Sequence, residues 1–101
     1  MAIRSDVSES GDLIKISISG RFDFSAHQDF RDSYEGSEPT TQRYQVDMRE
    51  TTYLDSSALG MLLLLRDFAG GDEGKVEITN CNADVRKILA ISNFEQLFTI
   101  H

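Results

Sequence analysis

The sequence has little of what disulfide frameworks and membrane spans require. Its single cysteine, Cys81, cannot form an internal disulfide, which suits a reducing compartment. The longest apolar run, Met61 to Leu65, is far shorter than the roughly 20 residues that span a bilayer. Residues 1–10 lack the apolar core of a signal peptide. We therefore expect a cytoplasmic protein without a membrane segment.

Basic residues are scarce relative to acidic ones. Ten lysines and arginines stand against 17 aspartates and glutamates, which gives a net charge of -7 at pH 7. This excess of acid argues against binding to nucleic acid or to an anionic membrane, because both are densely negative. Other proteins are the expected partners. With 101 residues, 40% of them hydrophobic, the chain fits a single domain spanning residues 1–101.

Motifs for catalysis and metal binding are also missing. His27 stands apart from other ligand types and His101 is the last residue, so no histidine metal site is predicted. Asp23, Asp47 and Asp55 leave open a receiver-like cation site, but no lysine is placed as in a receiver. The sequence has neither a Gly-x-Ser-x-Gly elbow nor a phosphate-gripping glycine-rich loop. We expect no enzymatic activity and no cofactor.

Hydrophobic periodicity predicts strands that alternate with helices. Leu13 to Ser19 alternates apolar and polar residues, as a strand with one buried face does, and Ile3 and Val7 indicate a weaker strand before it. Residues 3–19 therefore form a predicted hairpin. The other expected elements are a helix over 26–34 capped by Ser25, a strand over 43–48, a helix over 56–68 ending at Gly70 and Gly71, a strand over 75–79, and a helix from Asn82 or Asp84 with Val85, Ile88, Leu89 and Ile91 on one face.

These elements define an α/β protein. Strands separated by helices need crossover connections, so the sheet is expected to contain parallel pairs beside the N-terminal hairpin. Loops are expected at 36–41, which contains the only proline, and at 72–74.

The most informative motif is Asp55-Ser56-Ser57, where an apolar helix is predicted to begin. Asp55 is a good N-cap, and both serines fall in the first helical turn. A phosphate there would meet unpaired backbone N–H groups at the positive end of the helix. The same residues also fit an ordinary capping sequence. The strand before them, the apolar helix after them and Asp23 in the matching loop favour a regulated serine.

The chain resembles STAS domains of the anti-sigma factor antagonist type. The likeness rests mainly on Asp47 to Gly60, which is similar to the family's phosphoacceptor loop, then on Gly20 to Ala26, and more weakly on Val85 to Leu89 together with Asn93 to Ile100. It implies the STAS fold, a mixed sheet of four to five strands with helices packed mainly on one face. It also implies that Asp47 ends a strand, that Asp23 lies near Ser56, and that Ser56 is the phosphoacceptor, with Ser57 less favoured. Ala58 stands where many relatives have glycine.

The resemblance implies control by partner switching. The unphosphorylated protein would bind an anti-sigma factor that is a serine kinase with a GHKL-type ATPase domain, or a response regulator. Phosphorylation of Ser56 would release this partner, and a PP2C-type phosphatase would restore binding. The output would lie in transcription, stress or biofilm control. We expect a monomer or a weak dimer.

The partner-binding surface is expected around the phosphoacceptor. Apolar residues surround the helix that follows Asp55, so some of them cannot face the sheet. Met61 and Leu64 either form a docking patch or are buried by flanking helices. Two other functions stay open, a small-ligand sensor and a small hydrolase that uses Ser56 or Ser57. The candidate partner-binding residues are Asp23, Asp55, Ser56, Ser57, Ala58, Met61 and Leu64.

Overall fold

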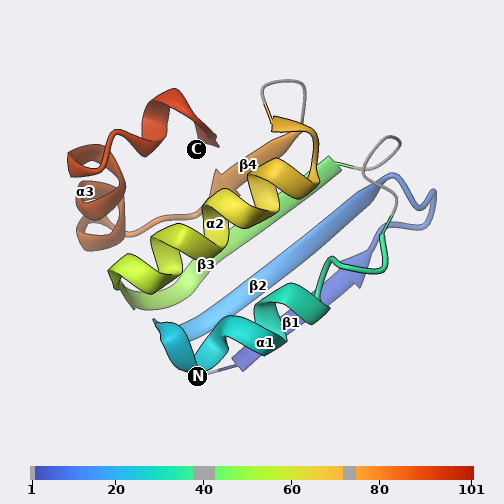
Figure 1. The fold of residues 1–101 in the computed structure, drawn as a ribbon, viewed down its shortest axis with the longest axis horizontal. Helices are drawn as coiled ribbons and strands as arrows, with labels where there is room; N and C mark the ends of the chain where they lie inside the picture. Colours follow the sequence, from blue (N-terminus) through green and yellow to red (C-terminus); the bar gives the residue numbers. More distant parts are fainter. Residues whose placement is uncertain (1, 38–42, 72–74) are drawn as a thin grey trace.

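A five-stranded mixed sheet forms the centre of the molecule (Figure 1). The structure is a computed structural model that describes residues 2–37, 43–71 and 75–101. The strands lie side by side in chain order, and only β1 and β2 are antiparallel, so the predicted hairpin and α/β class are confirmed. The strands are β1 (Ala2–Val7), β2 (Leu13–Phe22), β3 (Arg43–Leu54), β4 (Val76–Thr79) and β5 (Thr99–Ile100).

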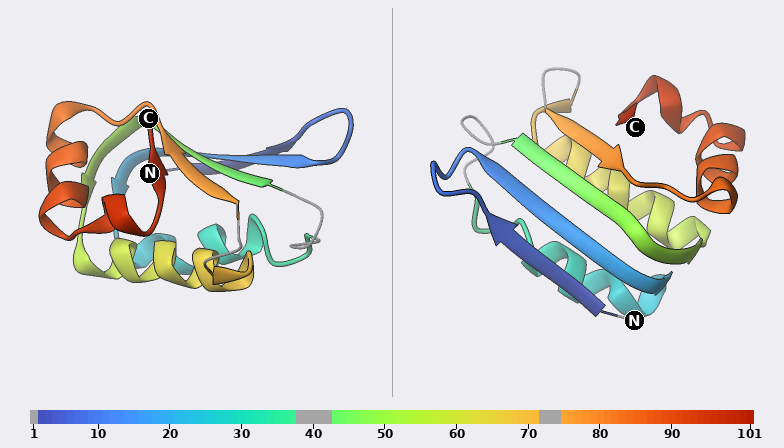
Figure 2. Two further views of the ribbon diagram at one scale, coloured as in Figure 1. Left: turned by 90° about the horizontal axis from the view of Figure 1, so that it is seen from above. Right: turned by 180° about the vertical axis from the view of Figure 1, so that it is seen from behind.

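Helices cover one face of this sheet. The helices α1 (His27–Asp32) and α2 (Ser56–Phe68) lie next to each other on that face, and the opposite face of β1 to β4 is open (Figure 2). A short 3-10 turn, η1 (Phe24–Ala26), leads into α1. The helix α3 (Ala83–Ile91) lies beside the later part of β3, where the Asn82 side chain donates a hydrogen bond of 2.9 Å to the Thr51 carbonyl oxygen. A second 3-10 turn, η3 (Phe94–Gln96), precedes β5.

The core lies between the sheet and the two covering helices. Alternate residues of β2 and β3 point toward the helices, while the residues between them point to the open face. The Phe30 and Tyr34 rings lie 5.7 Å apart between centroids, as their spacing predicted, although α1 itself ends at Asp32. The buried residues that these elements contribute include Ile14, Ile16, Ile18, Tyr44, Val46, Met48, Met61, Leu62 and Leu65.

The strand β3 is longer than predicted. It has twelve residues where β2 has ten, and two shifts in register, after Ser17 and after Gly20, take up the difference. Such bulges break the alternation of inward and outward side chains. The polar stretch after Met48 therefore looked like a loop in the sequence but is strand. The expectation that Asp47 ends its strand is wrong, because β3 continues to Leu54.

Two predictions about helices are also wrong. Asp23, not Ser25, caps the turn that leads into α1, and its carboxylate accepts a hydrogen bond from the Ser25 amide. Ile91 is 73% exposed, because it lies about 200° around α3 from the buried Leu89. The predicted start of α3 at Asn82 is confirmed, since the Asn82 side chain accepts from the Val85 amide. The predicted turn at 72–74 and most of the predicted loop at 36–41 lie outside the described residues.

Candidate functional site

The ends of β2 and β3 bring two acidic loops together. Phe22 at the end of β2 pairs with Leu54 at the end of β3, and the Asp55 amide lies 3.4 Å from the Phe22 carbonyl oxygen that accepts its hydrogen bond. Asp23 and Asp55 therefore leave neighbouring parallel strands at the same edge of the sheet. The start of α2 lies directly beyond Asp55.

Asp55 caps α2, and backbone N–H groups without an acceptor in the helix remain beside Ser56. Its carboxylate accepts a hydrogen bond of 2.8 Å from the Ala58 amide. The first amides of an α-helix have no acceptor within the helix, and those of Ser56 and Ser57 are the first two of α2. The Ser56 side chain is exposed, whereas that of Ser57 is half-buried. The hydroxyl that an enzyme reaches most easily is therefore that of Ser56, next to N–H groups suited to an anion.

Asp23 adds negative charge close to this helix start. The Ser25 amide and hydroxyl both donate hydrogen bonds to its carboxylate, and they hold the pKa of Asp23 below its ordinary value. The Arg21 Nε atom lies 3.9 Å from the same carboxylate, an exposed and weak ion pair. Asp23 is therefore ionised at neutral pH. A phosphate on Ser56 would meet helix N–H groups together with nearby carboxylates.

Exposed aromatic side chains flank the same place. Phe24, which follows Asp23, is 71% exposed, and Tyr53, two residues before Asp55, is 40% exposed. The Arg21 guanidinium carbon lies 4.5 Å from the centroid of the Tyr53 ring, within cation-π distance. Sequence reasoning did not select these residues, although an aromatic within two residues of each aspartate was the available signal. Aromatic and arginine side chains are enriched at protein interfaces.

The structure divides the candidate docking residues between surface and core. Ala58 and Met61 are buried, at 0% and 3% exposure, whereas Leu64 is 51% exposed. Leu64 is eight residues beyond Ser56 in α2, about 12 Å along the helix. It borders a groove of about 260 Å³ between α1 and α2, and Met61 lines this groove from below the surface. The other residues that line the groove are His27, Phe30, Arg31, Tyr34, Glu35 and Phe68.

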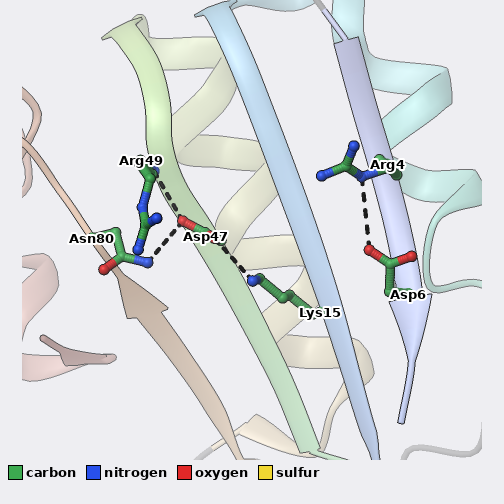
Figure 3. Close-up of polar contacts among 6 residues, drawn as sticks. All are labelled: Arg4, Asp6, Lys15, Asp47, Arg49 and Asn80. Atoms are coloured by element: carbon green, nitrogen blue, oxygen red, sulfur yellow. Dashed lines mark hydrogen bonds and ion pairs between the residues drawn. The ribbon is translucent and has the colours of Figure 1, made fainter.

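Asp47 lies on the open face of the sheet, in a network of its own (Figure 3). Lys15 Nζ lies 3.3 Å from its carboxylate, and the Asn80 side chain and the Arg49 amide each donate a hydrogen bond of 3.0 Å. Burial raises the pKa of Asp47, but the bonds from Arg49, Asn80 and Lys15 outweigh it, so the pKa is lowered from its ordinary value. Asp47 is therefore a charged structural residue that links β2, β3 and β4.

This placement separates the three acids that were considered as a cation site. Asp47 is seven residues before the end of β3 and eight before Asp55, a separation of roughly 25 Å along the strand. Among the described residues, no group of three or more histidine, cysteine or acidic side chains is placed to hold a metal ion. Burial raises the pKa of the Cys81 thiol, which fits a structural thiol better than a reactive one.

Among the described residues, no helix combines the length and the apolar character needed to cross a bilayer.

Comparison with known families identifies the fold. The family described as "Mlab, STAS domain" matches residues 5–99 of this chain. The chain belongs to the STAS domain family. A STAS-domain containing protein of Pseudomonas aeruginosa (strain UCBPP-PA14) is 63% identical over 100 residues, which cover 99% of this chain and 99% of that protein.

Solved structures share the STAS fold at low sequence identity. An anti-sigma factor antagonist from Mycobacterium paratuberculosis is 17% identical, with a TM-score of 0.77 over 99% of this chain and 86% of that chain. The phosphorylated form of the Bacillus cell fate determinant SpoIIAA is 16% identical, with a TM-score of 0.71 over 99% of this chain and 91% of that chain. These similarities confirm the predicted mixed sheet with helices mainly on one face.

Proposed function

We propose that this STAS protein is a single-domain, partner-switching regulator controlled by phosphorylation of Ser56. The observation that carries the proposal is the exposed Ser56 hydroxyl at the first residue of α2, beside helix N–H groups and two aspartates. A kinase can reach this hydroxyl without opening the fold. Ser57 is the less favoured acceptor, because its side chain is half-buried.

A phosphate at this position changes binding more than folding. It adds roughly 1.5 to 2 negative charges at pH 7 to a surface that already holds Asp23 and Asp55. The N–H groups at the start of α2 stabilise the phosphate within the domain. A partner surface shaped for a neutral serine loses its contact through repulsion and through the cost of removing water from the phosphate.

The partner-binding surface extends from the phosphoacceptor along α2. It includes Asp23, Asp55, Ser56 and Ser57, with Leu64 as its exposed apolar part beside the groove. Ala58 and Met61 shape this surface from beneath, since both are buried. This combination fits a protein partner. The apolar contact at Leu64 supplies affinity, and the contact at Ser56 makes binding sensitive to phosphorylation.

The relatives support a proposal for the kind of partner. One similar solved structure is named an anti-sigma factor antagonist, and another is the phosphorylated form of the cell fate determinant SpoIIAA. We infer that the unphosphorylated protein binds an anti-sigma factor with a GHKL-type ATPase domain that acts as a serine kinase, or a response regulator. A PP2C-type phosphatase restores binding, and the protein itself is not an enzyme. The output lies in transcription, stress or biofilm control.

Site mapping tests the phosphoacceptor. The protein is incubated with its cognate serine kinase and ATP, and the modified residue is located by mass spectrometry. We expect phosphate on Ser56, its loss in Ser56→Ala and its retention in Ser57→Ala. Phosphate on Ser57 alone, or on neither serine, counts against the assignment.

Binding measurements test the switch itself. Isothermal titration calorimetry measures the affinity for the kinase partner. Ser56→Asp is expected to lower this affinity at least tenfold, whereas Ser56→Ala should bind like wild type. Gln96→Glu is the matched control, because it adds one negative charge at an exposed residue of η3, away from the start of α2. All variants should keep near-native circular dichroism. Equal affinities of Ser56→Asp and Ser56→Ala would refute the switch.

A further inference from the structure

We propose that the outer edge of β1 pairs with the same edge of a second copy of this chain, forming a two-fold symmetric dimer with one continuous sheet. In the described sheet β1 is an edge strand that pairs with β2 on one side only (Figure 2). An edge strand presents backbone N–H and C=O groups that are ready to pair with another strand. This dimer goes beyond the phosphorylation switch and does not depend on it.

The hydrogen-bond pattern of the hairpin shows which residues point outward. The Ser8 amide donates a hydrogen bond of 2.9 Å to the Leu13 carbonyl oxygen. Bonded and non-bonded pairs alternate in an antiparallel ladder, so Asp6 and Arg4 direct their backbone groups toward β2. The backbone groups of Ile3, Ser5 and Val7 therefore face away from the sheet.

One register satisfies all the outward groups. When Ser5 lies opposite Ser5 of the second copy, Ile3 of each chain lies opposite Val7 of the other. Every outward residue then meets an outward residue, as an antiparallel ladder requires. A two-fold axis through this point makes the interface isologous, so the pairing closes at two copies.

The side chains on the helix-covered face support this register. Ile3 and Val7 pair with Ile18 and Ile14 of β2, whose side chains are buried on that face. Val7 is nevertheless 60% exposed in the isolated chain. A hollow of about 320 Å³ opens beside Val7, and its lining includes Ile14 and Tyr34. Ile3 of the second copy, placed opposite Val7, fills this hollow and covers both apolar side chains.

The charges on the open face are self-complementary. Arg4 Nε and Asp6 Oδ2 lie 3.7 Å apart on that face, and both side chains are largely exposed (Figure 3). In the dimer each Arg4 lies opposite Asp6 of the other copy, in non-hydrogen-bonded pairs whose side chains approach most closely. Shifting the register to its neighbouring allowed positions would place Arg4 opposite Arg4, or Asp6 opposite Asp6. Charges on an edge usually discourage pairing, but this order of signs selects one pairing.

The dimer leaves the phosphoacceptor accessible. Ser56 lies at the start of α2, next to the ends of β2 and β3, whereas the pairing edge lies on the far side of β2. Loss of the dimer and loss of the phosphorylation switch are therefore separate experimental results.

Sedimentation equilibrium of the full chain, from about 1 μM to about 1 mM, tests the proposal. We expect wild type to dimerise within this range. Ser5→Pro removes an outward N–H while keeping the bonds to β2, and it should weaken dimerisation at least tenfold. Arg4→Asp should weaken it similarly, because acids then face each other, and the charge swap Arg4→Asp with Asp6→Arg should restore it.

Circular dichroism of each variant separates unfolding from dissociation. Arg86→Asp, at an exposed residue of α3, is the control for the same change in charge as Arg4→Asp and should dimerise like wild type. Wild type that stays monomeric at about 1 mM overturns the proposal. A dimer that tolerates Ser5→Pro, or a charge swap that fails to restore a dimer lost in Arg4→Asp, also overturns it.

Discussion

Phosphoserine placed at position 56 should change the free energy of unfolding by less than about 1 kcal/mol, because two opposing effects are of similar size. The start of α2 stabilises an anion by roughly 0.3 to 1 kcal/mol per charge. For an assumed separation of about 7 Å in water, each pair of unit charges repels by roughly 0.6 kcal/mol, which physiological salt reduces by about half. Two aspartates and a nearly doubly charged phosphate then contribute about 1 kcal/mol of repulsion.

The assay is thermal unfolding of the homogeneous phosphoprotein, made by encoding phosphoserine genetically at position 56. A change of less than about 1 kcal/mol corresponds to a shift in Tm of less than about 8 °C for a chain of this size. If repulsion by Asp23 and Asp55 is the opposing effect, higher salt should raise the Tm of the phosphoprotein relative to that of the unphosphorylated protein. Affinity for the proposed kinase partner should still fall at least tenfold.

The control is phosphoserine at position 57, where the half-buried side chain has less room. It should lower the Tm more than phosphoserine at position 56 does. A Tm lowered by more than about 8 °C by phosphoserine at position 56, or a loss of the circular dichroism signal, would show that the phosphate destabilises the fold itself. That result would refute a switch that operates on an intact surface.

Three further predictions concern stability. Asp55→Ala should lower the free energy of urea unfolding by about 1 kcal/mol through loss of the cap on the Ala58 amide, and Asp55→Asn should retain most of it. Leu62→Ala should lower the free energy of unfolding by roughly 2 to 5 kcal/mol, because Leu62 is fully buried. Leu63→Ala should lower it by less than about 1 kcal/mol, because Leu63 is partly exposed, and equal losses would contradict the assigned core face. The lowered pKa of Asp47 means that its stabilisation is present above about pH 4 and is lost as the pH falls through the native pKa, so the difference between wild type and Asp47→Asn should shrink from pH 7 to pH 3. A difference that stays constant over this range, in urea titrations at both pH values, would argue against the Asp47 network.

Local chemistry made the start of α2 predictable from the sequence. An N-cap depends on one side chain and an amide three residues later, so Asp55 could be assigned without tertiary structure. The same reasoning failed between Asp23 and Ser25, because both are good caps and both lie near the helix start. The end of β2 decides between them, since it holds Asp23 in extended backbone with φ of -134°.

Packing on α2 could not be predicted for a different reason. Apolar residues occupy most of its circumference, so the sequence alone does not say whether Met61 or Leu64 faces the core. That choice depends on where the sheet and α1 lie, which is set by distant residues. The burial of Met61 and the exposure of Leu64 became visible only in the assembled fold.

The extra length of β3 means that chain spacing, as well as residue identity, positions Ser56. A deletion of one residue between Arg49 and Tyr53 would turn every later side chain of β3 to the opposite side, which would expel Leu54 from the interior and draw Tyr53 inward. The start of α2 would then be displaced even with Asp55 and Ser56 intact. Loop tips such as the one between β1 and β2 can absorb insertions, whereas the length of this stretch of β3 fixes where α2 begins relative to the sheet.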